Sequence, residues 1–126
     1  MSLASLGPEI QDFLSRYVQS VGHLEVLLLL FKRKERAWSP SETSDELRSS
    51  LFYAEEQLRE LTSLGLLAKD EKGSYKFEPK DPLASRTMPK LADLYQNRRT
   101  TLIDAIYARP IDPVQRFADA FKLKKD

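Results

Sequence analysis

The sequence contains no cysteine among its 126 residues. This absence excludes a disulfide framework and any zinc site built on thiolates, and it is compatible with a reducing compartment. Glycine is also scarce, with four residues scattered along the chain, so there is no glycine-rich loop of the kind that cradles phosphates. Histidine and carboxylate residues do not occur at metal-ligand spacing. We therefore expect neither a metal nor a cofactor.

Long apolar stretches are missing too. The longest apolar run, Val26 to Phe31, falls far short of the roughly 20 residues that a membrane-spanning helix needs. The first residues, MSLASLGPEIQ, lack the basic start and the apolar segment of a secretory signal peptide. The sequence therefore predicts a cytoplasmic protein that does not contact a membrane.

No catalytic constellation can be recognised from local sequence. His23 is the sole histidine, and neither a nucleophile nor an orienting carboxylate stands beside it. Glu55 and Glu56 are adjacent in a predicted helix, so they point to different faces and do not form a carboxylate pair. We expect a binding protein rather than an enzyme.

Two helices are predicted at the start of the chain. Pro8 suits the first position of a helix over residues 8–20, and apolar residues recur there at helical spacing: Ile10, Phe13, Leu14, Tyr17, Val18 and Val21. Ser20 can cap a second helix. Because its residues 26–31 are apolar on every face, this helix is predicted to be central and buried. It ends in a basic cluster at residues 32–36.

Short elements follow. Residues 37–38 are predicted to form a short strand, and Ser39 or Ser41 can cap a short helix after it. Ser49 and Ser50 interrupt that helix and can cap the next one. This next helix has an apolar face made of Leu51, Ala54, Leu58 and Leu61.

A hairpin is predicted next. Gly65 is suited to end the preceding helix in a left-handed conformation. Residues 66–68 and 75–77 are predicted strands, with a turn at residues 70–73 between them. Beyond the hairpin, Pro89 is expected to start or kink a long helix from about Met88 to Ala108. Pro110 ends that helix, and a short one with Val114, Phe117 and Phe121 on one side follows.

The order of elements from residue 24 to 78 resembles the winged helix-turn-helix superfamily. The segment Leu58 to Leu67, LRELTSLGLL, is similar to the end of a recognition helix where it enters the wing. In that pattern the leucines anchor the helix and the glycine allows the chain to reverse into the sheet. The fold class predicted is mainly α with a small β-hairpin wing. A plain helical bundle with a surface hairpin is the alternative.

The resemblance implies DNA binding, with the second helix of the motif in the major groove. By position, the residues facing the bases would be Ser49, Ser50, Phe52, Tyr53, Glu56 and Gln57. Contacts to the DNA backbone from the wing and the basic cluster would come from Lys72, Ser74, Lys76, Lys32, Arg33, Lys34 and Arg36.

The charge of the motif opposes this expectation. The whole chain carries a formal charge of +1, but between Ser39 and Leu61 six carboxylates face two arginines, a net charge of −4. DNA affinity comes largely from neutralising phosphates. Two functions therefore stay open: a DNA-binding transcriptional regulator, and a winged-helix module whose acidic helix binds a basic protein partner.

The flanking helices resemble the MarR-like arrangement, in which such helices form a dimer interface. One domain over residues 1–126 is expected, with a flanking helix at 8–20, a winged helix core at 21–80 and dimerisation helices at 81–126. We expect a homodimer whose interface contains Leu91, Leu94, Tyr95, Leu102, Ile106, Phe117 and Phe121. The alternative is that the long helix packs against the first helix of the same chain.

Overall fold

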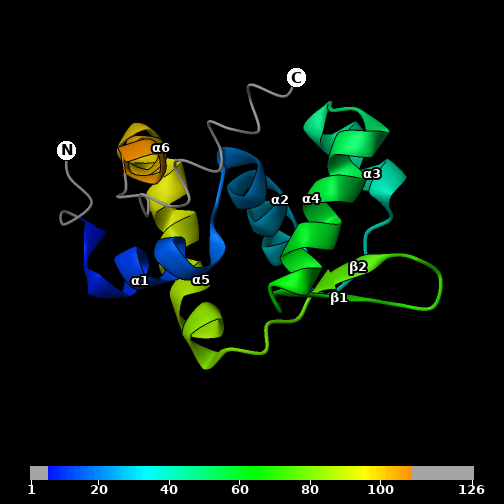
Figure 1. The fold of residues 1–126 in the computed structure, drawn as a ribbon, viewed down its shortest axis with the longest axis horizontal. Helices are drawn as coiled ribbons and strands as arrows, with labels where there is room; N and C mark the ends of the chain where they lie inside the picture. The colour runs from blue at the N-terminus through cyan, green and yellow to red at the C-terminus, as the bar shows by residue number, and fades with distance from the viewer. Residues whose placement is uncertain (1–5, 109–126) are drawn as a thin grey trace, which may run out of the picture.

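A computed structural model of the protein describes residues 6–108. Along that part of the chain lie six helices and one two-stranded antiparallel sheet (Figure 1). The elements in chain order are α1 (Pro8–Tyr17), α2 (Val21–Lys32), α3 (Pro40–Leu47), α4 (Leu51–Ser63), β1 (Leu67–Lys69), β2 (Tyr75–Phe77), α5 (Pro82–Asn97) and α6 (Arg99–Ala108). The prediction of a mainly helical fold with a small hairpin is confirmed.

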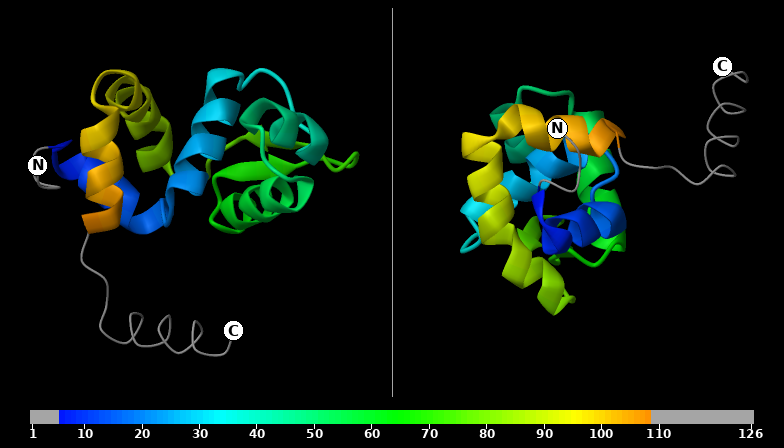
Figure 2. Two further views of the ribbon diagram at one scale, coloured as in Figure 1. Left: turned by 90° about the horizontal axis from the view of Figure 1, so that it is seen from above. Right: turned by 90° about the vertical axis from the view of Figure 1, so that its left-hand side faces the viewer.

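Helix α2 lies in the middle of the molecule. In Figures 1 and 2, α1, α5 and α6 lie on one side of it, and α3, α4 and the hairpin lie on the other. None of its residues before Lys32 is exposed, and Leu24, Val26, Leu27 and Leu30 are completely buried. The uniformly apolar segment therefore forms the core shared by both halves, as its sequence predicts.

Local side-chain caps set the boundaries of α3 and α4. Ser39 and Glu42 form a capping box at the start of α3, in which each side chain accepts a hydrogen bond from the other residue's backbone N–H. Arg48 then adopts a left-handed conformation (φ 56°), which ends α3. Ser50 caps α4 by accepting a hydrogen bond from Tyr53 N. These caps and the turn at Arg48 separate two helices that would otherwise merge.

The hairpin is fixed by its register and by a third short segment. Leu67 pairs with Phe77 and Lys69 with Tyr75. Trp38 adds a single bridge to the outer side of β2, where its backbone exchanges two hydrogen bonds of 2.7 Å with Tyr75. The strand predicted at residues 37–38 is thus reduced to one residue, and Trp38 is buried.

The predicted long helix from Met88 to Ala108 is wrong. Asp81 caps α5 by accepting a hydrogen bond from Leu83 N, and Pro82 occupies the first turn, so the helix starts well before Pro89. Pro89 lies inside α5 without ending it. The chain breaks instead at Arg98, whose backbone angles (φ −137°, ψ 48°) are not helical, and α6 follows.

Helix α1 is tied to the start of α5 by polar contacts. The Tyr17 hydroxyl donates a 2.5 Å hydrogen bond to Asp81 Oδ2. This bond is the main reason that the pKa of Asp81 lies below its usual range. Glu9 adds ion pairs with Arg86 and Lys90.

The expected dimer interface is corrected at three of its positions. Leu91 and Leu102 have no exposed surface and Ile106 is 5% exposed, so all three belong to the intramolecular core. Leu94 and Tyr95 are half-buried against the same core. Phe117 and Phe121 lie outside the described residues. One chain covers this apolar face by folding α1, α5 and α6 together, so a second chain is not needed to bury it.

We predict that Leu102→Ala lowers the free energy of unfolding by about 2–5 kcal/mol, because it leaves a cavity in a fully buried site. The matched control is Thr100→Ala on the exposed side of α6, which should change stability by less than about 0.5 kcal/mol. Denaturant unfolding at several protein concentrations measures both. If the loss of unfolding free energy caused by Leu102→Ala becomes smaller at higher protein concentration, Leu102 contributes to a dimer interface instead.

Candidate functional site

Helix α4 has one face in the core and one in solvent. Its buried residues, Ala54, Gln57, Leu58 and Leu61, are spaced three or four apart and face α2 and β1. The opposite face is therefore the part of the predicted recognition helix that a partner could reach.

The first turn of α4 exposes an unusual amount of apolar surface. Leu51 is 49% exposed, Phe52 70% and Tyr53 38%. These are three of the four large apolar side chains that are exposed within residues 6–108, and the fourth is Tyr107. We call Leu51, Phe52 and Tyr53 the apolar turn. Aromatic side chains such as Phe52 and Tyr53 are enriched at protein interfaces, and tyrosine is also enriched among the residues that dominate binding energy.

Tyr53 is held in place by the start of α2. Its hydroxyl lies directly over Gly22, where an added Cβ would come within 2.0 Å of the Tyr53 oxygen. Burial is the main cause that raises the pKa of Tyr53, and the charges of Glu25, Glu56 and Glu60 raise it further. Tyr53 therefore presents a neutral hydroxyl and a half-exposed ring.

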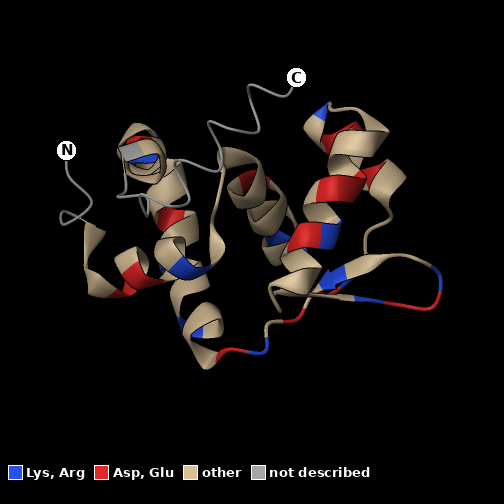
Figure 3. Cartoon of the chain, viewed as in Figure 1, with Lys and Arg blue, Asp and Glu red and all other residues tan. Residues whose placement is uncertain are grey.

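The helices α3 and α4 expose several carboxylates. Glu55 and Glu60 are exposed on α4, and Asp45 and Glu46 are exposed on α3. Figure 3 marks the acidic residues as red segments along both helices. Residues 40–63 contain six carboxylates and two arginines. Of the six, Glu42 forms an ion pair of 2.7 Å with Arg36, which lies outside this segment. The candidate recognition surface therefore combines the apolar turn with the exposed carboxylates of α3 and α4, which we call its acidic surround.

Gln57 is the one predicted base-facing residue that the structure contradicts. It is 6% exposed, and its Oε1 points towards Gly22. Its spacing from Ala54 and Leu61 places it on the buried face of α4, whatever its polarity. Ser49 is half-buried, and Ser50 is exposed but uses its hydroxyl as the cap. Phe52 and Tyr53 are on the outer face, and Glu56 is partly exposed.

His23 joins α2 to α4 through a contact that the sequence did not reveal. The backbone N–H of Gln19 donates to His23 Nδ1, so the ring proton is on Nε2, which donates to Glu60 Oε1 at 2.6 Å. His23 is 2% exposed and Glu60 47% exposed. The two residues are 37 positions apart, so local spacing carries no signal for this pair.

The predicted basic contacts divide into two groups. Three cations rest on aromatic rings around the hairpin: Arg36 lies 4.0 Å from the centre of the Trp38 ring, Lys34 5.1 Å from Phe31 and Lys69 5.7 Å from Tyr75. Of the predicted wing contacts, Lys72 and Lys76 are exposed and Ser74 is half-buried. These cations lie beside the hairpin, where the exposed carboxylates Asp70, Glu71 and Glu78 partly offset their charge.

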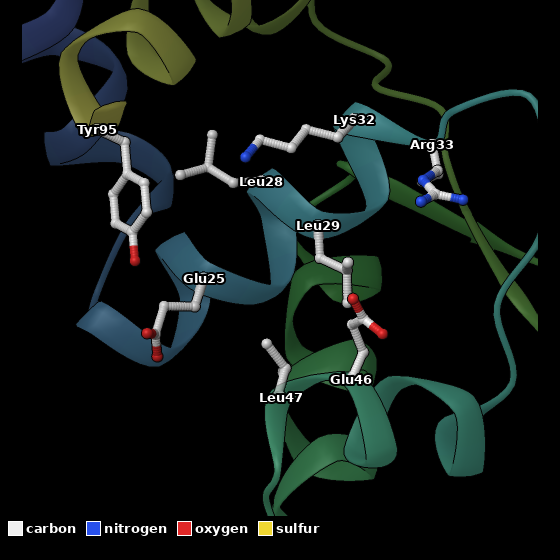
Figure 4. Close-up of a pocket in the computed structure, with 8 residues that line it drawn as sticks. All are labelled: Glu25, Leu28, Leu29, Lys32, Arg33, Glu46, Leu47 and Tyr95. Atoms are coloured by element: carbon white, nitrogen blue, oxygen red, sulfur yellow. The ribbon is translucent and has the colours of Figure 1, made fainter. Parts of the chain in front are cut away.

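Lys32 and Arg33 belong to a different surface. They line a groove of about 260 Å³ between α2, α3 and α5, together with Glu25, Glu46, Tyr95 and three leucines. In Figure 4 the Lys32 side chain extends towards Leu28 and Tyr95, whereas Arg33 lies apart from it on the side away from Tyr95. The basic cluster predicted at residues 32–36 is therefore not one continuous phosphate-binding surface.

Comparison with known protein families, curated proteins and solved structures gives no match for this chain. Within the described residues, no group of three or more histidine, aspartate or glutamate side chains could hold a metal ion. No helix in residues 6–108 is long and apolar enough to cross a bilayer.

We predict that Glu60→Ala destabilises the protein by about 1 kcal/mol, because the buried Nε2–H of His23 loses its acceptor. Glu60→Gln should retain stability, since its amide oxygen can still accept the bond. Glu55→Ala, on the exposed face of the same helix, is the control. Urea unfolding at neutral pH measures all three, and equal stability of Glu60→Ala and Glu55→Ala would show that the contact contributes nothing.

Proposed function

We propose that residues 21–80 form a winged helix-turn-helix unit that binds another macromolecule and has no enzymatic role. In this proposal α3 and α4 are the helix-turn-helix, the hairpin is the wing and Trp38 supplies the first strand. The support is the order of elements, the tight turn at Arg48 and the antiparallel hairpin after Gly65.

We propose further that the partner is a protein with a basic, amphipathic segment, and that this segment binds the outer face of α4. The apolar turn within an acidic surround is the observation that carries this proposal. Burying Phe52 and Leu51 would supply most of the affinity. The carboxylates would select a positively charged partner and speed its encounter.

Duplex DNA is the second candidate. The cations beside the hairpin favour it, because Lys69, Lys72 and Lys76 could contact phosphates. The inserted helix would nevertheless bring Glu55, Glu56 and Glu60 towards the phosphates. Leu91 and Leu102 are in the core of the single chain, which weakens the case for a homodimer. Without a homodimer, two recognition helices would not be held one turn of DNA apart. The protein partner is therefore the better proposal.

The two candidates predict opposite responses to substitutions. The probes are a synthetic amphipathic peptide of leucine and lysine and a mixed-sequence DNA duplex, each titrated with the full chain at several salt concentrations. For the peptide, Phe52→Ser and the pair Glu55→Gln/Glu56→Gln should each weaken binding about tenfold, or ~1.4 kcal/mol. The control Lys72→Gln/Lys76→Gln should leave it unchanged.

The reverse pattern would contradict the proposal. A duplex that binds with an affinity that falls steeply with salt, and is released by Lys72→Gln/Lys76→Gln, would establish the DNA-binding alternative. If Phe52→Ser leaves the affinity for the peptide unchanged, the apolar turn is not the binding surface.

A further inference from the structure

We propose that residues 109–126 of this chain bind in cis to the apolar turn of α4 and its acidic surround. The proposal deepens the proposed function, because the tail would then occupy the surface that we assign to a basic partner. The docking itself does not depend on that assignment.

The apolar surfaces of the two segments complement each other. Phe52 is 70% exposed, Leu51 about half exposed and Tyr53 more than a third exposed. In the tail, Val114, Phe117 and Phe121 are spaced three and four apart, the spacing that places side chains on one face of a helix. Each segment thus supplies apolar surface that the other can cover.

Their charges are also opposite. Residues 109–126 contain five lysine and arginine residues and three aspartates, which gives a net charge of +2. The α3–α4 segment carries −4 over residues 40–63. Three of the five basic residues lie just after Phe121, so an apolar contact at Phe121 would bring them near the carboxylates of α3 and α4.

The length of the tail determines how far it can reach. It begins directly after α6, which ends at Ala108. Phe117 is nine positions after Ala108 in the sequence. An extended segment of that length can span up to about 30 Å. Tyr107 is 74% exposed and would extend the apolar surface towards the tail.

Docking of this kind would make the tail a competitor of the partner. When its site is covered for part of the time, a partner binds with an apparent association constant equal to the intrinsic constant multiplied by the uncovered fraction. The exposed turn would also be protected from non-specific contacts when no partner is present.

The absence of cysteine allows a direct test in the full chain. Leu51→Cys combined with Ala118→Cys places one thiol on the apolar turn and one in the tail. The control pair, Lys72→Cys with Ala118→Cys, places the first thiol at the tip of the hairpin instead. In a glutathione redox buffer, we expect the first pair to form an intramolecular disulfide with an effective concentration at least tenfold above the control. Adding Phe117→Ser and Phe121→Ser should reduce it to the control value.

Equal disulfide formation in the two pairs would overturn the proposal, as would a covalent dimer in place of the intramolecular product. Neither measurement involves a partner. If the disulfide forms as expected but the leucine–lysine peptide does not bind, the proposed function fails while the docking stands. If both hold, Phe117→Ser/Phe121→Ser without the cysteines should tighten peptide binding several-fold.

Discussion

The burial of α2 on all sides is the constraint on which the rest of the structure depends. Its leucines form the core for α1 and α5 on one side and for α4 and the hairpin on the other. Because α4 must pack its apolar stripe against this helix, its opposite face is left in solvent. Gly22 strengthens the constraint, since it admits the Tyr53 side chain close to the α2 backbone. The exposed turn that we propose as a binding surface is thus a consequence of how α4 meets α2.

The sequence predicted the elements whose signals are local. Ser39, Ser50 and the apolar run of α2 were enough to place three helices, and Gly65 and the turn at residues 70–73 were enough to place the hairpin. The start of the C-terminal helix was predicted wrongly because it was assigned to Pro89. The cap at Asp81 instead starts α5 at Pro82, and Pro89 lies inside the helix. Periodicity placed Leu102 on an apolar face, but only tertiary packing shows that its own chain buries it. The contact between His23 and Glu60 also depends on tertiary packing, so spacing could not indicate it.

The candidate site was predicted in outline but not in detail. Position in the motif correctly brought Phe52 and Tyr53 to the outer face of α4, yet it also included Gln57, which the same helical periodicity places in the core. The four basic residues within positions 32–36 suggested a single phosphate-binding cluster. Because side chains on a helix end point in different directions, Lys32 and Arg33 line the groove, while Lys34 and Arg36 rest on aromatic rings near the hairpin.

The central claim is that the outer face of α4 is the surface that a partner contacts. An amide-resolved NMR titration of the full chain with the basic amphipathic peptide, and separately with a DNA duplex, tests it most directly because it locates each contact. We expect the peptide to shift the amides of residues 50–60 and to leave those of residues 69–76 unchanged. Shifts at residues 69–76 and along α4 on adding the duplex, with none on adding the peptide, would contradict it.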